Sequence, residues 1–381
     1  MKVSILCFDL SSNAFGRAGL LAQALSRFCD VEIIGPSRRG GIWAPMSQIE
    51  IPVKKFEWRR YPGFFKMRKN ILDAIDGEII LASKLMPTSF GIGLQKKKNS
   101  GKPLILDIDD WELGFFYHSG FLGKIGRFLN FSNPNGLPYV WRMEHLVGQA
   151  DAISVSNLFL QKKFGGKLLP HCRDTKTLNP LKFNADDVKE EMGFIGKKIL
   201  MFLGTPRSHK GIDDLLDAFK KIDNPDLHLV IIGVESKQEF LKGIDVSVKD
   251  RVTVMPKTPF DKLTKNLSAA DIIVIPQRKT SDSIGQIPAR LFDAMAMAKP
   301  ILTTRVSDIP EVLGDCGYLT EPNEPSQLAD AIQYILAHSN EAQKKGQAAR
   351  ERCQQMYDIS NLESGLKELI ERVTVGEDVK W

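Results

Sequence analysis

The sequence predicts an α/β fold made of two doubly wound domains. Short apolar runs of strand length alternate with helical segments, both before and after the Pro- and Asn-bearing stretch 179–187. Continuous apolar runs of this kind are typical of parallel strands that are buried on both faces. The chain has 381 residues, and one domain usually takes roughly 150. Two such series therefore predict two domains, each with a parallel sheet.

The expected elements follow this alternation along the chain. In the first series, strands are expected at 3–8, 31–35, 77–83, 103–108 and within 145–156, and a helix at 18–28. In the second series, strands are expected at 198–204, 227–233, 251–256, 271–276 and 300–304, and helices at 211–222, 288–298 and 325–339. The expected bounds are 1–182 for the first domain, 183–355 for the second and 356–381 for a closing helical segment.

The composition excludes several classes of protein. With 43% hydrophobic and 26% charged residues, the chain is neither a disordered protein nor a collagen. No apolar run approaches the ~20 residues of a membrane-spanning helix. The first run, 3–10, is interrupted by Asp9 and favours a strand over a signal peptide. The five cysteines are scattered without metal-ligand spacing, which suggests reduced thiols. We therefore expect a cytoplasmic protein.

Positive charge is concentrated in the first half. Residues 1–182 hold 26 Lys and Arg against 15 Asp and Glu, whereas the remainder holds 26 against 31. Within that half, residues 54–69 interleave Lys and Arg with aromatic side chains, a pattern that suits an anionic membrane surface. A charged loop that packs a few aromatics is the alternative. No recognised nucleic-acid motif accompanies the stretch, so no nucleic-acid partner is expected. We expect peripheral attachment to the inner face of a membrane.

The segment 204–216 has the pattern of an anion site. A strand ends at Gly204, a turn with Arg207, His209 and Lys210 follows, and a helix begins after Gly211. Fixed cations beside the free N–H groups of a helix start bind phosphate or diphosphate well. A solvated loop with routine charges is the alternative interpretation.

A second candidate site lies at the start of the helix expected at 288–298. Pro288 suits the first position of a helix. Arg290 and Asp293 are three residues apart and so share one helix face. They could form an ion pair within the helix, or they could bind a phosphate oxygen and a ribose diol.

In the first domain, acidic residues gather at the end of the strand 103–108. Asp107, Asp109 and Asp110 fall within four positions, which is costly in a buried place unless the carboxylates are solvated, paired or used. A Mg²⁺ site is a competing interpretation, and Asp110 could also cap the next helix. Lys84, after the strand 77–83, is a further candidate that faces the crevice.

The motifs of the second half resemble the donor half of the GT-B glycosyltransferases of family 4. They are GTPRSHKG at 204–211, IPARLFDAMAMAKPIL at 287–302 and DIPEV at 308–312, in that order. The resemblance extends over essentially the whole chain. It implies two Rossmann-like domains that face a cleft, with the closing helix 356–381 packing back on the first domain. The first domain would bind the acceptor and the second the nucleotide-sugar donor.

By this resemblance, Lys210 takes the place of the family's lysine on the donor diphosphate. The family's arginine directly follows the glycine, where this chain has Thr205, and Arg207 can supply the same cation. Arg290 matches the basic residue of the PxK variant of the later helix. The backbone of Gly204 and of Ile287–Ala289 (Ile287, Pro288, Ala289) is then expected close to the diphosphate.

The family's E-x7-E motif is altered in this chain. Asp293 falls where the family has the second glutamate, which resembles a ribose-diol acceptor. The first glutamate would fall at Gly285 and is therefore absent.

On the acceptor side, the resemblance places Asp109 at the reaction centre. Asp107 and Asp110 flank it, and Asp110 and Lys84 are further candidates on the acceptor side. Ser12, Asn13 and Gly16 lie near the place where the family has paired glycines close to the substrate.

The resemblance implies transfer of a sugar from a UDP-, GDP- or ADP-sugar to a hydroxyl acceptor, with retention of configuration. Arg207 and Lys210 would stabilise the leaving diphosphate, with neither a metal ion nor a separate cofactor. A lipid-linked acceptor, in surface polysaccharide or glycolipid synthesis, would agree with membrane attachment. A sugar-nucleotide epimerase of the same fold and a non-catalytic scaffold stay open as alternatives.

Overall fold

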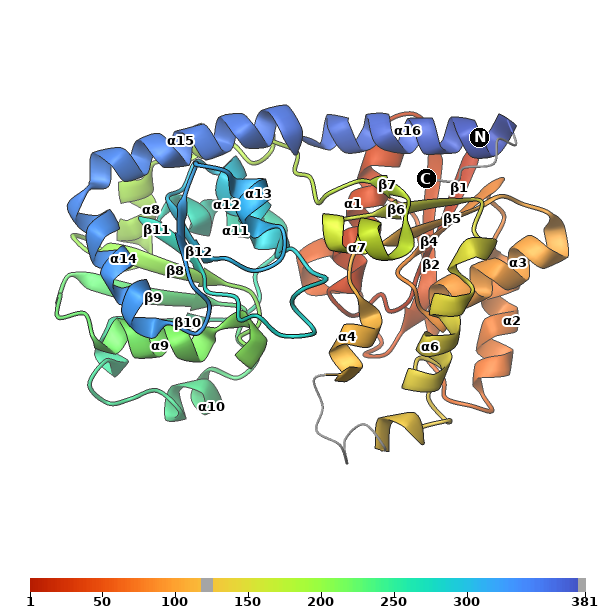
Figure 1. The fold of residues 1–381 in the computed structure, drawn as a ribbon, viewed down its shortest axis with the longest axis horizontal. Coiled ribbons are helices and arrows are strands. Elements are labelled where there is room, and N and C mark those ends of the chain that lie inside the picture. The colour runs from red at the N-terminus through yellow and green to blue at the C-terminus, as the bar shows by residue number, and fades with distance from the viewer. Residues whose placement is uncertain (118–125, 376–381) are drawn as a thin grey trace. The chain divides into compact units, whose positions relative to one another are not determined.

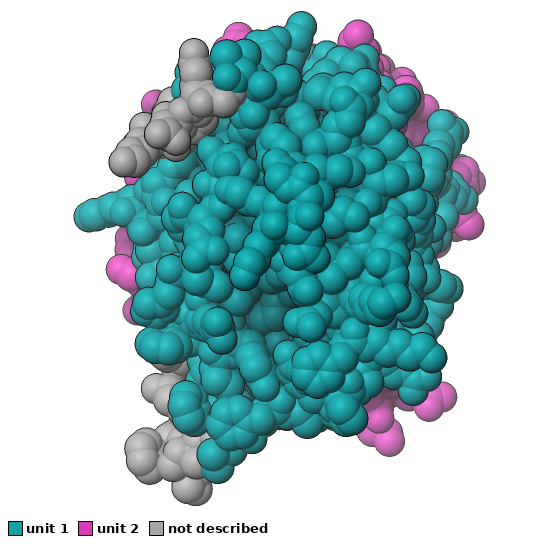
Figure 2. All heavy atoms as spheres, turned by 90° about the vertical axis from the view of Figure 1, so that its right-hand side faces the viewer, with its two compact units in different colours: residues 1–171, 359–381 teal, residues 172–358 magenta. Residues whose placement is uncertain are grey.

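A computed structural model gives the fold and describes residues 1–117 and 126–375 (Figure 1). The chain divides into two compact units, coloured separately in Figure 2. Unit 1 comprises Met1–His171 and Ile359–Trp381, and unit 2 comprises Cys172–Asp358.

The described residues of unit 1 form a seven-stranded parallel sheet in the order β3-β2-β1-β4-β5-β6-β7. Its strands are β1 (Lys2–Cys7), β2 (Asp30–Ser37), β3 (Val53–Glu57), β4 (Ile79–Ser83), β5 (Leu104–Ile108), β6 (Ala152–Val155) and β7 (Lys167–Leu168). The central strands β1, β4 and β5 are apolar and almost wholly buried, as parallel strands with both faces covered require.

Helices cover both faces of this sheet. They are α1 (Ala14–Leu25), α2 (Phe64–Ala74), α3 (Ile92–Ser100), α4 (Glu112–Tyr117), α6 (Leu137–His145), α7 (Leu158–Phe164) and α16 (Ile359–Val375). Alternate residues of β1, β2, β4 and β5 form a hydrophobic cluster with α2 and its neighbours. On the other face, α1 lies against β1, β2 and β4, and α16 packs on α1 (Figure 1).

The described residues of unit 2 repeat this architecture with a six-stranded parallel sheet in the order β10-β9-β8-β11-β12-β13. Its strands are β8 (Lys198–Leu203), β9 (Leu227–Ile232), β10 (Val252–Met255), β11 (Ile272–Ile275), β12 (Ile301–Thr304) and β13 (Tyr318–Thr320). Its helices are α8 (Ala185–Glu191), α9 (Ile212–Lys220), α10 (Lys237–Lys242), α11 (Phe260–Ser268), α12 (Ala289–Ala296), α13 (Ile309–Leu313), α14 (Pro325–Ala337) and α15 (Ser339–Met356).

Alternate residues of β8 show why the sheet of unit 2 needs helices on both faces. Leu200 and Phe202 belong to the cluster that buries α9 and α14. Met201 and Leu203 belong to the cluster that buries α12, α13 and α15. Side chains of one strand point alternately to the two faces of its sheet, so each face has a core of its own.

Both sheets reverse their strand order beside their first strand, between β1 and β4 in unit 1 and between β8 and β11 in unit 2. In open α/β sheets, ligands bind outside the carboxyl ends of the strands at this switch point. The prediction of two doubly wound, Rossmann-like domains is confirmed.

The division into units differs from the expected bounds at 182 and 355. It falls after His171 and after Asp358. The segment that follows His171 is bound to unit 2, because Arg173 pairs with Asp293 and the Oγ1 of Thr175 donates to the Asp358 carboxylate at 2.6 Å. The sequence placed this segment in the first domain because it carries no strand or helix pattern of its own.

The closing helix α16 returns to unit 1, as expected. Leu362, Leu366 and Leu369 are buried there. A Cβ at Gly365 would lie 2.3 Å from the Cδ2 of Leu169, so the helix approaches β7 too closely for a larger residue. The expected helical segment extended to residue 381, and its last six residues lie outside the described ones.

Candidate functional site

The structure brings Gly204, Lys210 and Arg290 together at the carboxyl end of β8. Gly204 adopts a φ of +103°, which favours glycine. A Cβ at Gly204 would lie 3.2 Å from the Nη1 of Arg290 and 3.6 Å from the Nζ of Lys210. The two predicted diphosphate cations therefore lie beside the predicted glycine, at the switch point of unit 2.

Residues at the end of β8 hold the side chain of Arg290 in place. Its Nη1 donates to the carbonyl of Leu203 at 2.6 Å, and its guanidinium lies 4.9 Å from the centre of the Phe202 ring. The side chain is buried, yet its Nε and Nη2 have no hydrogen-bond partner among the described residues. Burial lowers the pKa of the guanidinium to about 10. A buried cation with two unused donors is suited to an incoming anion, which would satisfy both.

The loop after β8 is held tightly against the end of β11. Its short helix, Ser208–Lys210, ends at Gly211, whose φ is +68°. A Cβ at Gly211 would lie 1.7 Å from the carbonyl oxygen of Pro276, so this contact requires glycine. Arg207 begins the turn with an exposed side chain. Its part in phosphate binding stays a prediction.

Two polar contacts that the sequence did not predict hold this loop to the segment after β11. The Nδ1 of His209 lies 3.0 Å from the Asp282 carboxylate. Burial opposes ionisation of Asp282, but hydrogen bonds from His209 and Thr280 outweigh it and lower its pKa to about 2. Arg278 makes a bidentate ion pair with Asp214 in the first turn of α9. Its Nε and Nη2 donate to the two carboxylate oxygens at 2.7 and 2.6 Å.

Asp293 has a partner that sequence reasoning missed. Its carboxylate pairs with Arg173, which also donates to the carbonyl of Ala289 at 2.9 Å. Of the two interpretations left open, the pair within the helix with Arg290 is not the one that the structure shows. Arg173 is 120 residues away in sequence, so helix spacing could not have indicated it. Asp293 as a ribose acceptor stays a prediction.

The predicted backbone positions lie just before α12. Ile287 is buried in the core, and Pro288 is the residue that precedes the first helical position. The carbonyl of Ala289 is occupied by Arg173. Gly285, in place of the family's first glutamate, lies in the loop that joins β11 to α12.

In unit 1, Lys84 draws the predicted carboxylates into one buried cluster. Its Nζ lies 2.8 Å from Asp109 and 3.1 Å from Glu112, and it also pairs with Asp110. Each of these four side chains is at most 10% exposed. Burial, only partly offset by Lys84, raises the pKa of Asp109 to about 7. Glu112, which the sequence analysis did not single out, completes the cluster.

Asp107 does not belong to this cluster, because its carboxylate forms an ion pair with Arg17. The Nη2 and Nε of Arg17 donate to the two Asp107 oxygens at 2.7 and 2.9 Å, and Ser154 donates to Asp107 at 2.7 Å. The three carboxylates considered as Mg²⁺ ligands are therefore paired with the guanidinium of Arg17 or the ammonium of Lys84. The signal that could have revealed Arg17 is its place inside the apolar segment AFGRAGLLA.

The turn between β1 and α1 holds the remaining acceptor-side candidates. The Oγ of Ser12 donates to the carbonyl of Asp9 at 3.1 Å, and Asn13 directly precedes α1. A Cβ at Gly16 would lie 3.1 Å from the Trp43 ring. These contacts shape the turn, and the role of Ser12, Asn13 and Gly16 toward an acceptor stays a prediction.

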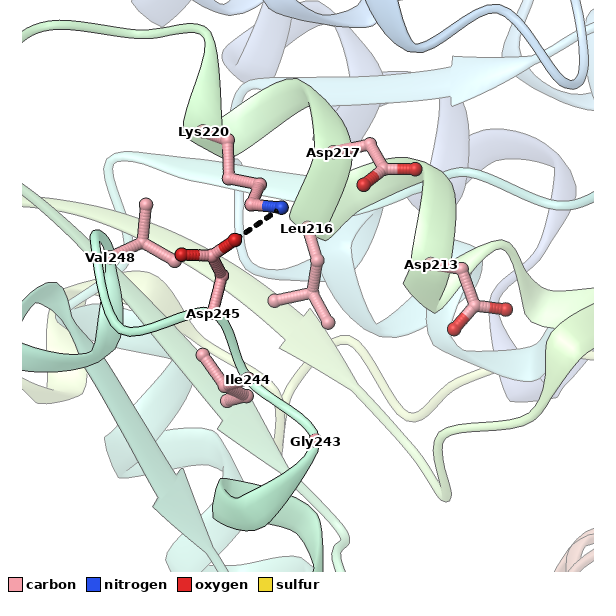
Figure 3. Close-up of a pocket in the computed structure, with 8 residues that line it drawn as sticks. All are labelled: Asp213, Leu216, Asp217, Lys220, Gly243, Ile244, Asp245 and Val248. Carbon is pink, nitrogen blue, oxygen red and sulfur yellow. Dashed lines mark ion pairs between the residues drawn. The ribbon is translucent and has the colours of Figure 1, made fainter.

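A separate pocket lies between α9 and residues 243–248 (Figure 3). The Nζ of Lys220 pairs with Asp245 at its edge, at 2.7 Å. Its lining contains none of the predicted site residues: Asp213, Leu216, Asp217, Lys220, Gly243, Ile244, Asp245 and Val248. The candidate donor site is therefore the switch point and not this pocket.

Comparison with known proteins finds a family match within unit 2. Residues 197–338 match the model of the family described as Glycosyl transferases group 1. This stretch is similar to the group 1 glycosyltransferases. The group 1 stretch contains Gly204, Lys210 and Arg290, so the candidate donor site lies wholly within it.

Curated relatives match only part of the chain. N-acetyl-alpha-D-glucosaminyl L-malate synthase of Bacillus anthracis is 30% identical over 178 residues, which are 45% of this chain and 44% of that protein. Alpha-maltose-1-phosphate synthase of Mycolicibacterium smegmatis is 26% identical over 220 residues, which are 53% of this chain and 55% of that protein. The chain thus spans about half the length of the curated relatives that it matches.

Solved structures match nearly the whole chain. Sucrose-phosphate synthase from Thermosynechococcus elongatus aligns with a TM-score of 0.77 and 17% identity over 99% of this chain and 100% of that one. HepE from Anabaena in complex with UDP-glucose aligns with a TM-score of 0.77 and 15% identity over 97% and 99%. Identities this low support the fold alone. The predicted GT-B fold is confirmed. The resemblance that the motifs of the second half indicated is supported by the family match of residues 197–338.

Proposed function

We propose that the protein is a glycosyltransferase that moves a sugar from a nucleoside diphosphate sugar to a hydroxyl acceptor. The observation that favours this function is the buried guanidinium of Arg290, which keeps two unused donors beside Gly204 and Lys210. As the glycosidic bond opens, the departing diphosphate gains negative charge. Fixed donors and cations directed at that charge stabilise the transition state more than the ground state.

The donor belongs to the class of UDP-, GDP- or ADP-sugars. A structural neighbour from Anabaena, HepE, was solved with UDP-glucose, which supports a nucleotide-sugar donor here. Lys210 and Arg290 supply the positive charge that a metal ion would otherwise bring to the diphosphate. The exposed side chain of Arg207 is free to add a third cation by a change of rotamer. The proposed reaction is therefore metal-independent, and it retains the configuration of the sugar.

The acceptor side of the proposal rests on Asp109. This carboxyl lies at the carboxyl end of β5 among Lys84, Asp110 and Glu112. Its raised pKa lets it exchange a proton near neutral pH, as a group that contacts an acceptor hydroxyl needs to do.

Two alternative functions predict different results in an activity assay. An epimerase would release no sugar to an acceptor. A non-catalytic scaffold would bind nucleotide weakly and would not turn over any nucleotide sugar.

Nucleoside diphosphate is expected to raise the melting temperature of the protein, and Lys210→Ala is expected to remove most of that shift. Loss of one charge-assisted contact costs about 1.5–3 kcal/mol of binding free energy. The measurement is a thermal-shift and calorimetric titration with UDP, GDP and ADP. Lys242→Ala, at an exposed lysine of α10 in the same unit, is the matched control. Equal affinity of both variants would remove Lys210 from the site.

We also propose that unit 1 attaches to an anionic membrane face through a wider surface than 54–69. In the structure these residues contribute β3 and the start of α2, so Phe64 is buried while Phe65 is 55% exposed. A continuous aromatic path leads on from Phe65: Tyr61 lies 5.2 Å from it and 5.5 Å from Tyr139.

The same path reaches residues 128–131. The hydroxyl of Tyr139 donates to the carbonyl of Phe131 at 2.9 Å, and the Phe128 and Phe131 rings lie 6.2 Å apart. Phe128, Leu129 and Phe131 are 51–61% exposed. Arg60 and Arg68 lie along this path. Exposed aromatics bordered by bases favour the interface of an anionic bilayer. No helix of the described residues is long and apolar enough to cross one.

Replacing Phe65 and Phe131 together by serine is expected to weaken co-sedimentation with anionic vesicles, because two exposed aromatic side chains are lost from the surface while its bases remain; Leu181→Ser should leave binding intact. Leu181 is the matched control because it is an exposed leucine of unit 2. Each base near the bilayer contributes about 1 kcal/mol, and salt screens such charges within ~8 Å at physiological ionic strength. Binding should therefore need anionic lipid and weaken in high salt. Equal binding to neutral vesicles, or none to either kind, would leave a soluble acceptor as the better proposal.

A further inference from the structure

Another buried donor without a hydrogen-bond partner among the described residues lies just after β11, at the switch point of unit 2. The side-chain amide of Gln277 is 1% exposed, and its Nε2 has no hydrogen-bond partner among the described residues. The backbone around it is fixed, since the Oγ1 of Thr304 donates to the carbonyl of Gln277 at 2.6 Å. An unsatisfied buried amide costs free energy, so the fold retains here a polar group that its own contacts do not explain.

The contacts of its neighbours locate Gln277 beside the loop that carries Lys210. Pro276, on one side, is the residue whose carbonyl meets Gly211. Arg278, on the other side, donates its backbone N–H to the carbonyl of His209 at 2.9 Å. The residues on both sides of Gln277 therefore contact the loop that carries Lys210, the candidate phosphate-binding residue.

The strand order gives the same location. β11 lies beside β8 in the sheet and pairs with it in parallel, so both strands end at the same edge, at the switch point of unit 2. Gln277 is the second residue after β11, and Gly204 directly follows β8. Gln277 and Gly204 therefore both lie at the carboxyl ends of the two strands that flank the switch point.

We propose that Gln277 is a donor-binding residue whose amide donates a hydrogen bond to an oxygen of the nucleoside diphosphate, next to Arg290. The proposal rests on the proposed function, because it assigns a further residue to the same donor site. A neutral amide at this place adds a directed hydrogen bond without adding a third buried charge.

The test compares wild type with Gln277→Met, which keeps the length of the side chain and removes its donor. UDP, GDP and ADP are the probes, and calorimetry gives their affinities. We expect the nucleoside diphosphate that wild type binds to bind the variant about 10- to 100-fold more weakly, as for a hydrogen bond to a charged group. Gln327→Met, at an exposed glutamine of unit 2, is the matched control and should bind as wild type does.

A second measurement distinguishes a binding role from a structural one. Without nucleotide, Gln277→Met should melt about 2–4 °C above wild type, since an apolar side chain replaces an unsatisfied amide. Gln277→Glu, which keeps the shape and brings negative charge toward the diphosphate, should bind at least as weakly as the methionine variant.

Three outcomes would overturn the inference. Wild-type affinity in either folded variant would remove Gln277 from the site and leave the proposed function standing. A lower melting temperature of Gln277→Met, together with wild-type affinity, would assign the amide to internal structure. Failure of wild type itself to bind any of the three probes would contradict the proposed function, and this inference with it.

Discussion

Arg17→Met is expected to destabilise unit 1 by about 3–5 kcal/mol, the cost of breaking a buried ion pair by removing one partner. The side chains of Arg17 and Asp107 are 1% and 0% exposed. Arg17 also donates to the carbonyls of Leu169 and Pro170 at 2.8 and 3.1 Å, so one substitution removes the cation that pairs with a buried carboxylate and the arginine hydrogen bonds of two carbonyls. The measurement is urea unfolding followed by the fluorescence of the tryptophans.

Two further variants distinguish burial from simple loss of an arginine. Arg27→Met removes an exposed arginine that pairs with Glu363 at 3.4 Å, and it should cost less than about 1 kcal/mol. The double variant Arg17→Met/Asp107→Leu should recover part of the stability, because it removes the stranded charge as well. If Arg17→Met and Arg27→Met lower the free energy of unfolding equally, the buried Arg17–Asp107 pair contributes no more to stability than an exposed ion pair does.

Lys84→Met is expected to have a comparable effect, about 3–5 kcal/mol, that depends strongly on pH. Lys84 is the cation shared by Asp109, Asp110 and Glu112. Asp109 already has its pKa raised to about 7, above its ordinary value, so the folded state holds its proton more tightly than the unfolded state does. Protonation below that pH therefore stabilises the fold, and losing Lys84, which lowers the pKa values of Asp109 and Glu112, raises both of them further.

The loss of stability in Lys84→Met should accordingly be larger at about pH 8 than at about pH 5.5, where Asp109 of the variant carries its proton. Thermal and urea unfolding of both proteins at the two pH values measure this difference. Lys69→Met removes an exposed lysine that pairs with Asp73 on α2, and should change stability by less than about 0.5 kcal/mol at either pH. A deficit for Lys84→Met that does not shrink on acidification would mean that the cluster is not stabilised by this charge.

The fold was largely predictable because its core strands are continuous apolar runs. The strands expected at 103–108 and 271–276 contain β5 and β11 almost residue for residue. Elements with little apolar content escaped prediction. β3 (Val53–Glu57) is polar and lies at the edge of its sheet, and α15 is a largely exposed helix rich in Lys, Arg and Gln. Such elements owe their structure to tertiary contacts and leave no periodic apolar signal in the sequence.

The candidate site divides in the same way. Gly204, Lys210 and Arg290 could be brought together from sequence because each follows a strand whose place in the sheet is predictable. Contacts made across long stretches of chain could not. Arg17 and Asp107 are 90 residues apart, and Arg173 reaches Asp293 from a segment without regular structure. Only the folded chain shows which carboxylates are already paired and which donors, such as those of Arg290 and Gln277, remain unused.

The return of α16 to unit 1 has a consequence for the order in which the chain is made. A ribosome releases β1 to β7 first and then the whole of unit 2, and only afterwards the helix that packs on α1. Unit 2 can therefore close its two cores while unit 1 still lacks the cover for α1. Until residues 359–375 emerge, the apolar face that later holds Leu362, Leu366 and Leu369 has no partner. During that interval, unit 1 is the part of the nascent protein that chaperones would be expected to hold.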